Sequence, residues 1–158
     1  MDMHVKERFR GHRALRQGCM SLPGHAYHVT AATLDRTAWF SNFHVACEAV
    51  RAFRAPGVLG DATLLAWVLM PDHVHWLLDT GDGAPIEKVV ARMKSASAVH
   101  ANRILARAGP LWYPAFHDRA LRHEDDLRAV ARYIVANPLR AGLVERIGDY
   151  PFWDCAWL

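Results

Sequence analysis

The chain has 158 residues, of which 52% are hydrophobic and 22% charged, and its formal net charge is +3. This length supports one domain with a hydrophobic core, and this composition excludes an intrinsically disordered chain. No apolar run is long enough to cross a bilayer, the N-terminus lacks the apolar stretch of a signal peptide, and the three cysteines are scattered, so we expect a cytoplasmic protein with reduced thiols.

The sequence pattern predicts a basic arm over residues 1–22 and one folded domain over residues 23–158. Alternating apolar residues indicate strands, apolar stripes at helical spacing indicate helices, and glycine and proline mark their ends. Thr37 is the predicted N-cap of the first helix, and Pro56 and Gly57 are expected to end it. The predicted elements are strand 25–33, helix 38–54, a hairpin of strands 62–70 and 73–79, helix 85–108, strand 112–121 and a last helix that contains Tyr133.

This order of elements is βαββαβ with one added helix, which predicts an α+β fold. The arrangement typical of it is a ferredoxin-like antiparallel sheet with helices on one face. The aromatic tail at residues 150–153 is expected to pack against this domain.

The segment at residues 71–76, Pro-Asp-His-Val-His-Trp, carries the most informative pair of side chains. His73 and His75 are two residues apart on a predicted strand, so both point to one face, while Val74 and Trp76 point to a core. Two neighbouring imidazoles form half of a site for a divalent metal ion. Strand histidines are more often structural, so this interpretation depends on a further ligand and a nucleophile.

The last predicted helix offers both of these groups. Tyr133 and Asn137 are four residues apart and share one helix face, at the edge of an apolar stripe. Pro138 biases Asn137 away from helical geometry, so we expect the pairing to be distorted. The stripe consists of Leu127, Val130, Ala131 and Ile134.

Together these motifs resemble those of the single-tyrosine HUH transposases, and among them the REP-associated tyrosine transposases. The resemblance covers nearly the whole chain, through "AYHVTAAT", "WVLMPDHVHWLL", "LWYPAFHDRALR" and "YIVANPLRAGLV". It implies cleavage and transfer of single-stranded DNA through a covalent 5′-phosphotyrosine at Tyr133, with His73, His75 and Asn137 as ligands of Mg²⁺ or Mn²⁺. The family usually has asparagine where this chain has Asp72, and this extra carboxylate could alter metal affinity.

Two other classes of function share parts of the pattern. A metal-dependent phosphodiesterase or nuclease that uses water would need the histidines but no tyrosine nucleophile. A non-catalytic DNA-binding module would need neither group. Only the transposase forms a covalent protein–DNA adduct, so an adduct distinguishes it from both alternatives.

The partner implied by the resemblance is single-stranded DNA with a hairpin, and hence a nucleoid-associated location, with a monomer favoured over a homodimer. Arginine outnumbers lysine sixteen to three, which suits phosphate recognition but also arises in GC-rich genomes. The basic arm is the first candidate to bind this DNA, and the long helix at 85–108 is the second. The predicted DNA-binding residues are Arg8, Arg10, Arg13, Arg16, Lys88 and Arg92.

Overall fold

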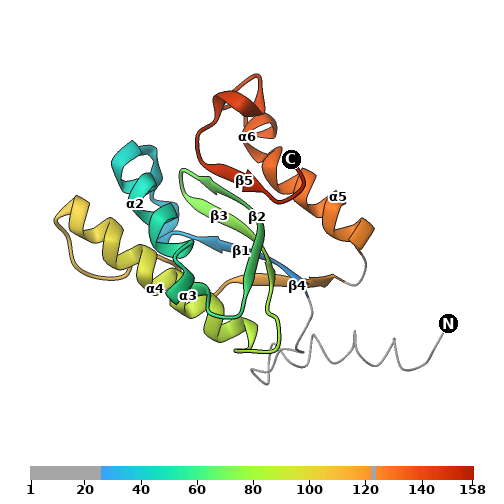
Figure 1. Ribbon diagram of the computed structural model, residues 1–158. Helices are drawn as coiled ribbons and strands as arrows, with labels where there is room; N and C mark the ends of the chain where they lie inside the picture. Colours follow the sequence, from blue (N-terminus) through green and yellow to red (C-terminus); the bar gives the residue numbers. More distant parts are fainter. Residues whose placement is uncertain (1–25, 122–123) are drawn as a thin grey trace.

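The computed structural model describes residues 26–121 and 124–158 (Figure 1). Five strands form one antiparallel sheet in the order β4-β1-β3-β2-β5, so β3 lies at its centre. The strands are β1 (Ala26–Ala32), β2 (Thr63–Met70), β3 (His73–Asp79), β4 (His117–Leu121) and β5 (Trp153–Cys155), and the helices are α2 (Phe43–Phe53), α3 (Pro56–Leu59), α4 (Ile86–Leu105), α5 (Glu124–Val135) and α6 (Asn137–Arg140).

The predicted ferredoxin-like order is confirmed, because the first four strands are joined as βαββαβ and pair in the order β4-β1-β3-β2. Helices α2 and α4 cover one face of the sheet, and the added helix α5 lies on the other side (Figure 1). Strand β5 extends the sheet beyond β2.

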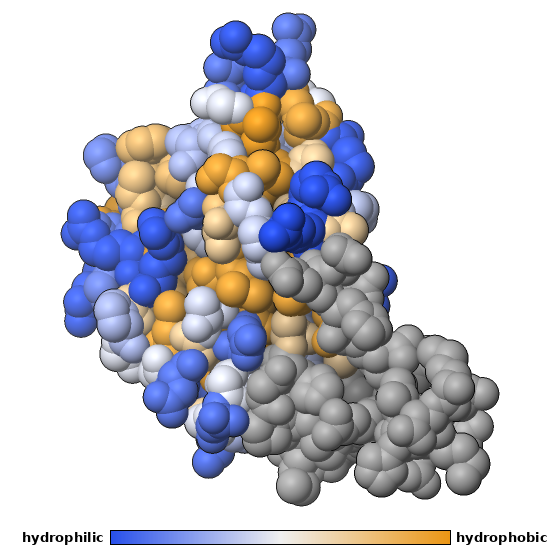
Figure 2. All heavy atoms as spheres, turned by 45° about the vertical axis from the view of Figure 1, so that its right-hand side comes forward, coloured by the Kyte–Doolittle hydropathy of each residue, from blue (hydrophilic) through white to orange (hydrophobic). Residues whose placement is uncertain are grey.

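The alternation of side chains along the strands builds two cores, one on each face. Trp76 is fully buried in the first core, where its ring lies 5.4 Å from that of Phe53 and 6.2 Å from that of Trp112. The second core is smaller and joins strand residues such as Leu77 to the apolar stripe of α5, which includes Ile134. Figure 2 turns this side of the molecule forward and shows a band of hydrophobic surface between hydrophilic flanks.

The first helix begins later than predicted. Thr37 does not cap α2, because a single 3-10 turn, Trp39–Ser41, comes between them. The cap is Asn42, whose Oδ1 accepts the backbone N–H groups two and three residues further on, at 3.0 and 3.2 Å. Pro56 opens α3 rather than ending a helix, and α4 ends three residues earlier than predicted, before a left-handed Ala106 (φ 50°).

The fourth strand is shorter than predicted, and the fifth was not predicted. Trp112 makes only an isolated bridge to Thr33, and regular pairing starts at His117, beyond Pro114, which has no N–H to donate to a strand neighbour. The tail packs against the domain as expected, and its last residue, Trp153, begins β5, which pairs with β2. A run this short carries no alternating pattern that would predict a strand.

Within the described residues, no helix is both long enough and apolar enough to span a membrane. Cys47 is half-buried, Cys155 is buried, and both are free thiols. The predicted basic arm, with Cys19, lies outside the described residues.

Candidate active site

The central strand β3 places the two predicted metal ligands side by side. Val74 and Trp76 point into the first core and are fully buried, so His73 and His75 point to the other face, which α5 partly covers. The two imidazole rings lie 5.1 Å apart between centroids, nearly perpendicular to each other. His75 is 9% exposed and His73 is half-buried, so the pair lies at the boundary of the second core.

Two residues of the neighbouring strand β1 orient His75. Its Nδ1 atom lies 2.9 Å from Nε2 of His28 and 3.1 Å from Oγ1 of Thr30. The tautomer with the proton on Nδ1 donates it to one of these atoms and leaves the Nε2 lone pair available for a metal. Burial, together with smaller effects of the neighbouring positive charges of His28, His73 and Arg140, lowers the pKa of His75 to about 3, so the ring is neutral near pH 7.

Asp72 orients His73 in the same way. Its Oδ1 atom lies 2.7 Å from Nδ1 of His73, and Nε of Arg36 donates to its other oxygen at 3.1 Å. Partial burial opposes ionisation of this carboxyl, but the hydrogen bond from His73 and the nearby Arg36 outweigh it and lower the pKa of Asp72. With Nδ1 occupied, Nε2 of His73 is the atom available to a metal, so both imidazoles have the same free nitrogen.

Tyr133 extends from α5 above the same face of the sheet. Val130 and Ile134 anchor α5 in the second core, whereas Tyr133 is 54% exposed. The ring lies edge-on to that of His28, with centroids 6.3 Å apart. The guanidinium carbon of Arg140 lies over the ring, 3.8 Å from its centroid, and Nη2 of Arg140 donates to the backbone carbonyl of Tyr133 at 2.8 Å. The phenol is thus accessible, while its ring is held by neighbours.

Asn137 lies in the first turn of α6, just after α5 ends. The break at Ala136 agrees with the expectation that Pro138 distorts the helix here. The Nδ2 atom of Asn137 donates to the carbonyl of Ile134 at 3.0 Å and, more weakly, to that of Tyr133 at 3.5 Å. Because these carbonyls hold the nitrogen, the amide oxygen is the atom that could bind a metal.

The donor atoms fit a divalent metal ion. Two imidazoles with free Nε2 atoms and one amide oxygen are ligands that transition-metal ions and Mg²⁺ accept, and such a set leaves positions open for phosphate oxygens. In residues 26–121 and 124–158, no group of three or more His, Cys, Asp or Glu side chains could hold a metal by itself. Among these described residues, a complete site would need a ligand of another type, such as Asn137.

Three residues of this site were not predicted as site residues. His28 and Thr30 alternate with core residues on β1, and their role depends on the register that sets Thr30 opposite His75. Arg140 lies seven residues beyond Tyr133 and reaches it only because the chain turns at α6. The sequence contained the alternation on β1, but no signal for the strand pairing.

The two predicted DNA-binding residues within the described part belong to α4, which lies on the other side of the sheet from α5, the helix of Tyr133 (Figure 1). Lys88 is exposed. Arg92 donates from Nε to the carbonyl of Val58 at 2.8 Å and from Nη2 to that of Leu59 at 3.3 Å, so it caps α3. Neither residue therefore adjoins the tyrosine. The four predicted arginines of the basic arm lie outside the described residues.

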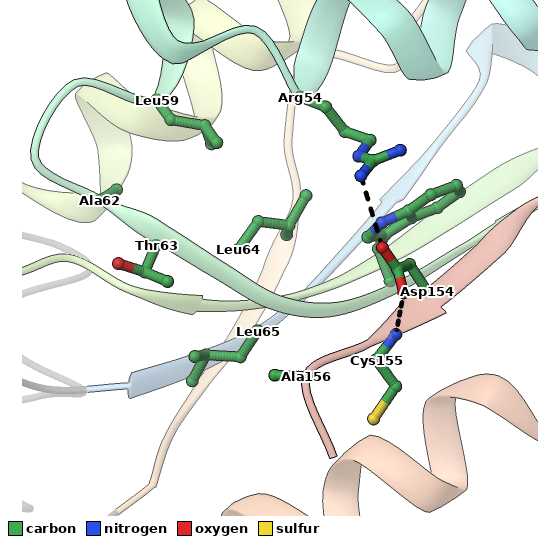
Figure 3. Close-up of a pocket in the computed structure, with 10 residues that line it drawn as sticks. Arg54, Leu59, Ala62, Thr63, Leu64, Leu65, Asp154, Cys155 and Ala156 are labelled. Atoms are coloured by element: carbon green, nitrogen blue, oxygen red, sulfur yellow. Dashed lines mark hydrogen bonds and ion pairs between the residues drawn. The ribbon is translucent and has the colours of Figure 1, made fainter. Parts of the chain in front are cut away.

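A separate cavity of about 340 Å³ opens beside β2 and β5 (Figure 3). Arg54 points toward Asp154, with Nη2 3.4 Å from Oδ2, and the other carboxylate oxygen accepts the backbone N–H of Cys155 at 2.8 Å. Aliphatic side chains form much of the remaining lining. The only carboxylate in this lining is already paired, so the cavity offers no combination of nucleophile and metal ligands comparable to that around Tyr133.

A ferredoxin-like sheet that carries two strand histidines beside an exposed helix tyrosine defines the class of single-tyrosine HUH transposases. The sequence profile described as "Transposase IS200 like" matches residues 21–137. The chain therefore belongs to the IS200-like transposase family, whose members are enzymes of DNA cleavage and strand transfer, and the resemblance expected from the motifs is confirmed at this level.

Individual relatives agree with this assignment. The REP-associated tyrosine transposase of Escherichia coli (strain K12) is 30% identical over 89 residues, which cover 55% of this chain and 50% of the relative. This chain spans about half the length of the curated relatives it matches. A structure of a REP-associated tyrosine transposase bound to a REP hairpin has a TM-score of 0.66 at 21% identity, over 84% of this chain and 77% of that one. A candidate transposase from Deinococcus radiodurans has a TM-score of 0.52 at 27% identity, over 69% of this chain and 87% of that one.

Proposed function

We propose that this protein is a metal-dependent endonuclease and strand transferase for single-stranded DNA, and that Tyr133 is its nucleophile. The observation that carries the proposal is the position of the exposed Tyr133 ring against His28, which in turn contacts His75 of the histidine pair. One residue thus links the nucleophile to the metal ligands. His73, His75 and the amide oxygen of Asn137 are the proposed ligands of Mg²⁺ or Mn²⁺.

The bound metal ion would polarise the scissile phosphate and offset the negative charge that develops on it. The residues around it orient the reactants. Asp72 and His28 fix the ring orientations of His73 and His75 through their Nδ1 atoms, so the two Nε2 atoms would be the ones that hold the ion. Arg140 holds the ring of Tyr133 and adds a positive charge close to the attacking oxygen.

The covalent step exchanges one phosphoester for another. The hydroxyl oxygen of Tyr133 bonds to phosphorus, and the bond from phosphorus to the 3′ oxygen breaks. The phenol loses its proton and the leaving 3′ oxygen takes one up, so protons balance. The products are a 5′-phosphotyrosine and a free 3′-OH. A 3′-OH from another end can reverse the same exchange, which releases Tyr133 and joins the strands without a nucleotide cofactor.

The proposed substrate is a single strand that flanks a REP-like hairpin. This part of the proposal is supported by the name of the E. coli relative and by the hairpin in the structural neighbour. We propose a monomer as the working unit, since Tyr133 adjoins the histidine pair of its own chain through His28.

The test is covalent adduct formation on a labelled hairpin oligonucleotide with a single-stranded flank, in Mg²⁺ or Mn²⁺, followed by a denaturing gel. The wild type should give a band shifted by the mass of the protein, and Tyr133→Phe should give none while it still binds the DNA. Tyr113→Phe is a matched control, because Tyr113 is equally exposed (53% against 54%) and lies outside the site. Cleavage without an adduct would indicate a nuclease that uses water, and binding without cleavage would indicate a DNA-binding module.

A further inference from the structure

A groove of about 480 Å³ opens beside Tyr133, between α5 and the β4 edge of the sheet. Its walls are Tyr133 and the exposed β4 residues His117 and Arg119, with the buried Asp118 between them, and Ala129 and Val130 of α5 form an apolar side. The volume lies in the range of sites for single small molecules, so it suits one nucleotide and not a duplex.

Strand register connects this groove to the metal ligands. Thr30 of β1 lies opposite His75 on one side and opposite His117 on the other, and His28 lies opposite Arg119. Cross-strand partners on one face are direct neighbours, so polar side chains cross three strands in an unbroken row from β3 to the sheet edge. The rest of this face is packed by the second core. The groove is thus a continuation of the site.

The charge of the groove favours an anion. Arg119 lines the groove beside His28, its partner across the pairing of β4 with β1. Asp118 alternates with His117 and Arg119 along β4 and lies opposite the core residue Val29, so its carboxylate is directed to the other face of the sheet. Arginine forms paired hydrogen bonds with phosphate, and grooves that combine such cations with an aromatic wall are typical of single-stranded nucleic-acid sites.

We propose that this groove binds the nucleotide next to the scissile phosphate in single-stranded DNA, with its own phosphate on Arg119 and His117. The inference rests on the proposed function, because it takes the scissile phosphate to lie between Tyr133 and the histidine pair. Arg119 is here a substrate-binding residue that holds the strand and takes no part in the chemical step. These contacts are to the phosphate of the DNA backbone, so they do not depend on the identity of the base.

The first experiment measures binding without chemistry, in the Tyr133→Phe background, with a fluorescent hairpin oligonucleotide that carries a single-stranded flank. Arg119→Ala should weaken binding about tenfold, the value of one charged hydrogen-bond contact. It should also make the slope of log K against log salt less negative by about 0.7, which corresponds to one lost phosphate contact on a single strand. Arg103→Ala removes the same charge from the exposed surface of α4 and should change neither quantity.

The second experiment measures adduct formation by the enzyme with Tyr133 intact. Arg119→Ala should raise KM with kcat little changed, and Arg119→Lys should recover part of the loss. One neutral methylphosphonate linkage, moved along the flank, should reproduce the loss at a single position and add nothing further in Arg119→Ala, because both changes remove the same contact. Unchanged binding and salt slope in Arg119→Ala would overturn the proposal. So would effects of the methylphosphonate and of Arg119→Ala that add to each other at every position of the linkage.

The two proposals can fail separately. If no adduct forms but binding still depends on Arg119, the groove is a single-strand site and the proposed chemistry is wrong. If the adduct forms and Arg119→Ala matches Arg103→Ala throughout, the chemistry stands and the groove does not bind the strand.

Discussion

Asp72 provides the sharpest test of the metal site, because its side chain contacts a proposed metal ligand directly. Its carboxylate holds Nδ1 of His73 at 2.7 Å, a short hydrogen bond to a proposed metal ligand. Removal of such an outer partner usually costs 10- to 100-fold in metal affinity. We expect Asp72→Ala to lower the affinity for the metal about 100-fold. Asp72→Asn should lower it only about tenfold, since the amide oxygen can still accept the hydrogen bond from His73.

The assay is the Mn²⁺ concentration that gives half-maximal adduct formation, together with calorimetric titration of Mn²⁺ in the absence of DNA. Arg36→Ala is the control, because Arg36 contacts the other oxygen of Asp72 and leaves the bond to His73 in place. It should shift the midpoint much less than Asp72→Ala. Equal midpoints for Asp72→Ala and the wild type, in protein with an unchanged melting curve, would refute the idea that Asp72 orients a metal ligand.

Three further outcomes are expected. His73→Ala and His75→Ala should each abolish cleavage, and EDTA should do the same to the wild type; full activity in EDTA would rule out metal dependence. Arg140→Ala should slow adduct formation at saturating DNA by about tenfold, with partial rescue by added guanidinium, while the melting temperature changes little because an exposed cation–π contact contributes only about 0.5–1 kcal/mol. Deletion of residues 1–22 should weaken hairpin binding and flatten its salt dependence without loss of cleavage at saturating DNA; unchanged affinity and slope would show that the arm makes no phosphate contacts.

The fold could be predicted where a local pattern and a tertiary requirement agree. The hairpin of β2 and β3 follows from alternation around Pro71 and Asp72, and both strands were predicted within one residue of their bounds. The start of α2 could not be predicted, because Thr37 and Asn42 are both good N-caps and the choice depends on how the preceding turn packs. Strand β5 could not be predicted either, because its pairing with the edge of β2 is a long-range contact.

Some residues of the candidate site could also be predicted from the sequence, and others could not. The spacing of His73 and His75, and of Tyr133 and Asn137, follows from the period of a strand and of a helix, so both pairs could be read from the sequence. Their metal and catalytic roles remain proposals. His28 is different, because nothing in its local sequence separates it from an ordinary strand histidine; it becomes part of the site only through the pairing of β1 with β3.

The geometry of the site depends on the opposite core. A slip of one residue in the pairing of β3 would move every side chain to the other face, so the histidines would exchange places with Val74 and Trp76. Trp76 prevents this, because its large ring is fully buried and packs against Phe53 and Trp112 on the α2 and α4 side. Both histidines therefore face α5, and the same register aligns His75 with Thr30 and, one strand further, with His117 at the mouth of the groove. The packing that stabilises one face of the sheet thus fixes the position of the reactive groups on the other.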